Sequence, residues 1–99
     1  MNIEVKDNEA VISVKVNGDI EMMTIKEFKE KLLELGQSAD KDIELDLSEV
    51  EYIDSSGVGV LISLLKLQKK KDKVLQIKKA SQKVMNVLKL SSLSDVIDL

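Results

Sequence analysis

The residues whose types and spacing point to chemistry lie in one segment, Asp54-Ser55-Ser56-Gly57. The serines could suggest a nucleophile, and Asp46 and Asp54 together could suggest a carboxylate pair for acid–base work. The enzyme interpretations lack parts, however. The chain has no histidine for a Ser-His-Asp triad, and the segment lacks the glycine and lysine positions of a nucleophile elbow, a dinucleotide fingerprint or a P-loop. The sequence therefore predicts a protein that is not an enzyme.

The composition excludes further kinds of site. The 99 residues predict one domain, residues 1–99. Histidine and cysteine are both absent, so we expect no structural zinc site, no thiol chemistry, no disulfide and no cofactor or metal. The amino terminus lacks an apolar signal segment, and the longest mostly apolar run, residues 58–65, is far shorter than the ~20 residues of a membrane span. These absences predict a cytoplasmic domain with no membrane partner.

Charge is distributed unevenly along the chain. Residues 1–60 hold 15 acidic residues and 6 lysines, whereas residues 61–99 hold 9 lysines and 3 aspartates. The lysines of residues 66–73 could mark a nucleic-acid interface. Against this, the chain has no arginine to bind phosphate and guanine, and only two aromatic residues for base stacking. We expect a solvated, lysine-rich helix end and no direct nucleic-acid partner; an acidic partner on this face stays open.

The periodicity of apolar residues predicts the strands that position the Asp54 segment. Alternation over residues 3–5 and 10–16 predicts a β-hairpin, and residues 42–47 and 74–77 predict two further strands. The strand over 42–47 alternates instead of being apolar throughout. We therefore expect a single α/β domain whose mixed sheet has helices mainly on one face and a partly wet opposite face.

Helical spacing of apolar residues predicts helices over 25–35, 58–68 and 81–89, with Gly36 as the stop of the first. The resulting order is β-β-α-β-α-β-α plus a C-terminal tail. In that tail, Val96, Ile97 and Leu99 could form a short closing element.

The expected helix starts carry capping residues. Thr24 and Glu27 have the spacing of a capping box, Ser81 is the expected cap of the last helix, and Asp54 or Ser55 is the expected cap of the middle one.

Two features of the middle helix are not explained by capping. Gly57 and Gly59 lie in or near its first turn, where glycine costs about 1 kcal/mol relative to alanine. Residues 58–65 are apolar nearly all round, although a helix outside a sheet should have a polar face. Small residues beside surplus hydrophobic side chains indicate a surface that another protein approaches closely.

The run from Ile53 to Val60, I-D-S-S-G-V-G-V after an L-D-L strand, closely resembles the anti-sigma factor antagonists, the freestanding STAS domains of bacteria. Residues 17–24 are similar to that family's G-x-[LI]-[DE]-x-x-T segment. Residues 88–93 resemble its closing segment, with Ser92 where the family often has glycine. The resemblance covers nearly the whole chain and implies a STAS fold.

The resemblance implies a regulatory switch centred on Ser55. In such proteins the first serine after the aspartate is phosphorylated by an anti-sigma factor that is itself a serine kinase. The unphosphorylated form binds the anti-sigma factor and frees the sigma factor, and a serine phosphatase resets the system. A phosphate on Ser55 would add about −1.5 to −2 charges. We expect free amide groups at the helix start to stabilise it, so that the fold persists while repulsion removes the partner.

Several residues around Ser55 are expected to contribute to partner binding. Asp54 would fix the turn, Ser56 would act as a cap or be the modified residue instead, and Met22 and Met23 could be either contact or core residues. The expected partner-binding residues are Asp19, Glu21, Thr24, Asp54, Ser56, Gly57 and Gly59, with a capping role also open for Thr24.

Two other functions stay open for a STAS domain. One is an accessory subunit of a membrane transport complex that is not regulated by phosphorylation, and the other is a sensory domain that binds a small ligand. The acceptor serine of the Asp-Ser-Ser-Gly motif favours the antagonist.

Overall fold

The computed structural model describes residues 1–91 and 93–96 and contains one mixed sheet of four strands in the order β1-β2-β3-β4. The hairpin strands β1 and β2 pair antiparallel, whereas β2 with β3 and β3 with β4 pair in parallel. The predicted hairpin, mixed sheet and order of elements along the chain are confirmed. The strands are β1 Asn2–Asp7, β2 Val11–Asn17, β3 Asp42–Glu49 and β4 Leu75–Ala80.

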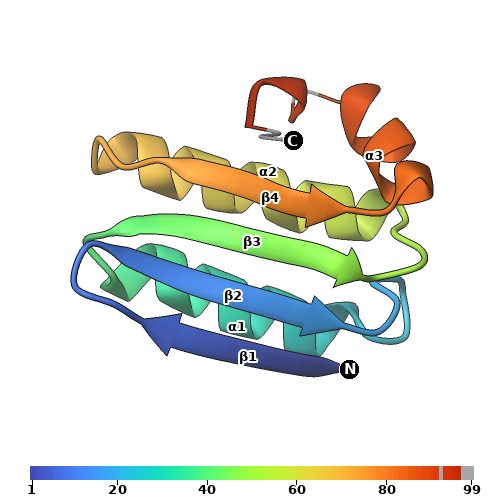
Figure 1. Ribbon diagram of the computed structural model, residues 1–99, viewed down its shortest axis with the longest axis horizontal. Coiled ribbons are helices and arrows are strands. Elements are labelled where there is room, and N and C mark those ends of the chain that lie inside the picture. The colour runs from blue at the N-terminus through green and yellow to red at the C-terminus, as the bar shows by residue number, and fades with distance from the viewer. Residues whose placement is uncertain (92, 97–99) are drawn as a thin grey trace.

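Two long helices cover one face of this sheet, as the alternating strand predicts. In Figure 1, α1 and α2 lie side by side behind the four strands, and α3 lies beyond the end of β4. A short 3₁₀ helix, η1, follows over Ser94–Val96; the predicted contributions of Ile97 and Leu99, and position Ser92, lie outside the described residues. The helices are α1 Ile25–Ser38, α2 Ser55–Lys70 and α3 Gln82–Lys89.

The core lies between the sheet and the two long helices. From β3, Ile43, Leu45 and Leu47 point to this side and are at most 1% exposed, and from α1 Phe28 and Leu32 are fully buried against them. Burying each such side chain contributes about 1.5–3 kcal/mol. The carboxyl end of β3 is thereby held firmly at the point where the chain turns into α2.

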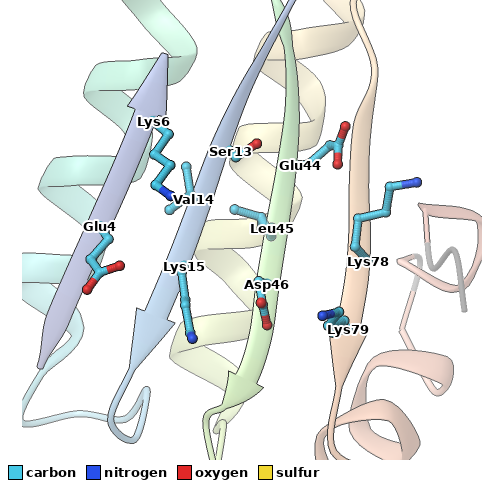
Figure 2. Close-up of a pocket in the computed structure, with 10 residues that line it drawn as sticks. All are labelled: Glu4, Lys6, Ser13, Val14, Lys15, Glu44, Leu45, Asp46, Lys78 and Lys79. Atoms are coloured by element: carbon cyan, nitrogen blue, oxygen red, sulfur yellow. The ribbon is translucent and has the colours of Figure 1, made fainter. Parts of the chain in front are cut away.

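The opposite face of the sheet is open and charged (Figure 2). Glu4, Lys15, Asp46 and Lys79 are successive partners across the four strands, so their charges alternate in sign. Burial raises the pKa of Asp46, but hydrogen bonds from Ser48 and the charges of Lys79 and Lys15 outweigh it, and the pKa lies below its ordinary value. This row lines a shallow hollow of about 400 Å³. The predicted wet face is confirmed.

Gly36 does not end the first helix, contrary to the prediction. The helix continues to Ser38, and Gly36 is buried where α1 crosses α2. A β-carbon on Gly36 would lie 2.8 Å from Leu64 Cδ1 and 2.9 Å from Leu67 Cδ1. Gly36 therefore permits the close approach of the two helices, a tertiary role that local stop signals do not reveal.

The surplus hydrophobic side chains of α2 lie along the sides of the helix and pack against the core. Val58, Ile62 and Leu65 are half-buried against the core, and only a narrow stripe that includes Gly59 and Ser63 is exposed. The helix is therefore embedded more deeply than a surface helix. Within the described residues, no helix combines the length and apolarity needed to cross a membrane.

Candidate functional site

The site lies at the carboxyl end of the sheet, where two connections run side by side. Ile20, in the connection after β2, forms a parallel bridge with Ile53, in the connection after β3. The Ile20 amide donates to the Tyr52 carbonyl at 2.9 Å, and the Asp54 amide donates to the Ile20 carbonyl at 3.0 Å. These bonds bring residues 19–24 next to the start of α2, as predicted for Asp19, Glu21 and Thr24.

The carboxylate of Asp54 caps α2, which confirms one of the two expected caps. Its Oδ1 accepts from the Ser56 amide at 3.0 Å, the Gly57 amide at 3.2 Å and the Ser56 hydroxyl at 2.5 Å. Its Oδ2 accepts from the Met22 amide at 3.1 Å. The bond from the Ser56 hydroxyl is the largest cause that lowers the pKa of Asp54; desolvation opposes it, and the three backbone donors add to the lowering. Asp54 is therefore ionised and holds both connections together.

The expectation that free amide groups await a phosphate on Ser55 is wrong for the two amides that follow Ser55. The Ser56 and Gly57 amides already donate to Asp54, and the Val58 amide donates to the Asp54 carbonyl at 3.1 Å. A carboxylate therefore occupies the anion-binding position of this helix start. An additional anion on Ser55 would lie next to the Asp54 charge, and the Ser56 and Gly57 amides would not be free to bind it.

The two serines of the motif differ in their surroundings. Ser56 is half-buried, and its hydroxyl donates to Asp54, so Ser56 supports the cap instead of being the cap. Ser55 is exposed, and its hydroxyl forms no hydrogen bond with any part of the chain that the structure describes. Of the two, Ser55 is the hydroxyl that an incoming enzyme can reach.

The capping box predicted for Thr24 and Glu27 is absent. Thr24 occupies the cap position of α1, but its side chain makes no capping hydrogen bond. Its hydroxyl turns back instead, donating to the Asp19 carbonyl at 2.7 Å and accepting from the Glu21 amide at 3.1 Å. Thr24 thus closes the loop that lies beside Asp54. Its hydroxyl oxygen accepts from the Glu21 amide of the loop instead of from an amide in the first turn of α1.

Gly57 and Gly59 lie on different sides of α2. Gly57 is buried, and a β-carbon there would lie 2.6 Å from Ile20 Cγ2 and 2.8 Å from Ile53 Cγ1. Gly59 is exposed, and a β-carbon there would meet nothing within 4 Å. Gly57 permits the bridge between the two connections, whereas Gly59 leaves space on the outer surface.

Met22 contributes to the site through its backbone amide, a role that the sequence does not predict. The Met22 amide donates a hydrogen bond to the Asp54 carboxylate. The side chains of Met22 and Met23 are 77% and 88% exposed. This exposure excludes a role in the core for both side chains. Two adjacent methionines that fit neither the strand period nor the helix period were the available signal.

Comparisons with known proteins complete the description of the site. The family described as "Mlab, STAS domain" matches residues 3–98. An anti-sigma-B factor antagonist of Bacillus subtilis is 31% identical over 99 residues, which cover 100% of this chain and 90% of that relative.

Solved structures share the fold at lower sequence identity. The unphosphorylated form of the anti-sigma factor antagonist SpoIIAA matches with a TM-score of 0.84 and 14% identity over 98% of this chain and 86% of SpoIIAA. The phosphorylated form of the Bacillus SpoIIAA matches with a TM-score of 0.78 and 15% identity over 98% of this chain and 89% of that chain. The fold of this chain is thus common to both forms of SpoIIAA.

Proposed function

Because this chain belongs to the STAS-domain family of anti-sigma factor antagonists, we propose that its unphosphorylated form binds an anti-sigma factor with serine kinase activity and so releases a sigma factor. Phosphorylation of Ser55 ends this binding, and a serine phosphatase restores it. The observation that carries the proposal is the exposed, unbonded hydroxyl of Ser55 at the first position of α2.

The surroundings of the two serines support Ser55 as the acceptor. The kinase transfers the γ-phosphoryl group of ATP to Ser55 Oγ, which forms a new P–O bond and releases ADP and the hydroxyl proton. Ser56 Oγ is the poorer acceptor, since its attack would break its 2.5 Å hydrogen bond to Asp54 and weaken the cap of α2.

The electrostatics of the site support release after phosphorylation. Phosphoserine carries about −1.5 to −2 charges, and two of the amides at this helix start, those of Ser56 and Gly57, are already bound to Asp54. During transfer the nucleotide phosphates of the kinase must lie next to Ser55, so the product complex holds several anions in contact. Two unit charges 4 Å apart at a protein surface repel by about 4 kcal/mol, which is a change of about a thousandfold in affinity.

The switch does not require a change of fold. Asp54 keeps its hydrogen bonds to Ser56, Gly57 and Met22 whether or not the neighbouring hydroxyl is esterified. The likeness of this chain to both forms of SpoIIAA is consistent with a modification that alters the surface and leaves the fold intact.

The test uses the purified wild type, Ser55→Ala, Ser55→Glu and the control Ser56→Ala, each mixed with the serine-kinase anti-sigma factors of the source organism. We expect binding by the wild type and Ser55→Ala, at least about tenfold weaker binding by Ser55→Glu, and phosphate on Ser55 by peptide mass spectrometry after ATP is added. Ser56→Ala should still be phosphorylated. Equal binding by Ser55→Glu, or phosphate on Ser56 alone, would refute the proposal; equal binding of a transporter ATPase by all four proteins would favour the transport function.

A further inference from the structure

A groove runs between α1 and α2 on the surface that faces away from the sheet. Its volume is about 280 Å³. Ile25, Leu33 and Val60 give it an apolar lining, and Lys29, Ser56 and Ser63 give it polar edges. This combination is typical of a surface that receives an apolar side chain from a partner.

Gly59 keeps this groove open. It lines the groove, and a β-carbon there would meet nothing within 4 Å, so no packing inside the domain requires a glycine. Glycine inside a helix is nevertheless less favourable than alanine. The space that Gly59 leaves is therefore available to a group from outside the domain.

The groove is continuous with the Ser55 site. Ser55 and Gly59 are four residues apart on α2 and so lie on the same face of the helix. Ser56 belongs both to the Asp54 hydrogen-bond cluster and to the groove lining. The exposed Met22 and Met23 precede α1 at the same end, where the Met22 amide binds Asp54. A partner that covers Ser55 thus meets apolar surface on the same side.

Charge alone does not explain how a kinase partner binds the unphosphorylated form. The groups near Ser55 are acidic, and the nucleotide phosphates of a kinase are anionic as well. Part of the binding free energy must then come from an interaction that does not depend on charge. Burial of apolar side chains is such an interaction. The groove, of about 280 Å³, is large enough to receive a side chain from a partner.

Resting on the proposed function, we infer that the groove between α1 and α2 seats an apolar side chain of the anti-sigma factor, on a segment whose carboxylate pairs with Lys29. Lys29 is exposed on the groove edge and forms no ion pair with the described residues. The apolar side chain stabilises the complex next to Ser55, and repulsion from the phosphate on Ser55 opposes this stabilisation.

The test measures the affinity of the purified anti-sigma factor, loaded with ADP, for groove variants by calorimetry. Gly59→Leu fills the groove and is expected to weaken binding at least about tenfold, whereas Gly59→Ala keeps most of the space. Lys70→Leu adds the same side chain at the far end of α2, about 16 Å away along the helix, and should bind like the wild type. Lys29→Glu should weaken binding in a salt-dependent manner, while Lys31→Glu on another side of α1 should not.

The outcomes separate this inference from the proposed function. If the wild type binds and is phosphorylated on Ser55 but Gly59→Leu binds equally well, the groove inference fails and the proposed function stands. If the wild type binds no such anti-sigma factor, both fail. If the wild type sediments as a dimer that Gly59→Leu dissociates, the groove seats a second copy of this chain and the inference is overturned.

Discussion

Alanine at each of the two glycines of α2 is expected to change the stability of the domain in opposite directions. At Gly59 the new methyl group meets open space, so only the helix preference changes. Alanine is favoured over glycine inside a helix by about 1 kcal/mol. For a domain of this size, 1 kcal/mol corresponds to a rise in Tm of about 4–8 °C.

At Gly57 the same methyl group enters occupied space. It would lie 2.6 Å from Ile20 Cγ2 and 2.8 Å from Ile53 Cγ1, and these two isoleucines are 0% and 2% exposed. β-Branched side chains have restricted χ1 angles, so relief requires the bridged backbone of Ile20 and Ile53 to move. Such overpacking costs about 1–3 kcal/mol, and the helix preference returns at most about 1 kcal/mol. The net loss of up to about 2 kcal/mol is expected to lower the Tm of Gly57→Ala by several degrees.

Thermal and urea unfolding of the wild type, Gly57→Ala and Gly59→Ala, followed by circular dichroism, would test this pair. The urea m value should be unchanged in all three proteins if only the native state is affected. A Gly57→Ala protein as stable as the wild type, or a Gly59→Ala protein less stable than the wild type, would refute the assignment of one glycine to packing and the other to open surface.

Three further perturbations have defined outcomes. Because the native pKa of Asp54 lies below its ordinary value, its ionised form stabilises the fold above about pH 3.9 and this contribution is lost at lower pH; the Tm difference between the wild type and Asp54→Asn should shrink as a pH series of melts goes below 4. Thr24→Val removes the two hydrogen bonds that close the loop before α1 and should cost about 1 kcal/mol or more in urea unfolding, whereas Thr24→Ser should cost less. Lys71→Met removes two hydrogen bonds to carbonyls at the end of α1 and should increase hydrogen exchange in its last turn while leaving the loop beside Asp54 unchanged.

The periodic parts of the fold could be predicted because each follows from a repeating local pattern. The alternation of Ile43, Leu45 and Leu47 with acidic residues predicts both a strand and a sheet with one wet face, and the structure has both. Similarly, Ser81 caps α3 as expected, accepting from the Val84 amide at 3.2 Å. The Ser81 hydroxyl also donates to the Val50 carbonyl at 3.4 Å, but this tertiary bond uses its hydrogen and leaves the oxygen able to accept from the helix amide.

The parts that could not be predicted depend on contacts between distant segments. Thr24 has the capping-box spacing, but its hydroxyl bonds to the loop that the Ile20–Ile53 bridge positions. The role of Gly36 depends on leucines of another helix.

The different roles of Gly57 and Gly59 did have a signal in the sequence. Gly57, Leu61, Leu64 and Gln68 recur at helical spacing and form the buried stripe of α2, whereas Gly59 and Ser63 share the exposed stripe. Extending the buried stripe from the later turns of the helix back to its start places Gly57 on the buried side and Gly59 on the exposed side. The motif residues alone do not distinguish the two sides of the helix.

The carboxylate cap of α2 has a consequence for the lifetime of the phosphorylated state in the proposed switch. Asp54 holds the helix start, the Ser56 hydroxyl and the Met22 amide together by bonds that do not involve Ser55 Oγ. We therefore expect that esterification of that oxygen would not require a second conformation of the domain. Under the proposed function, the off state would last as long as the phosphate ester, so its duration would be set by the phosphatase and not by the domain.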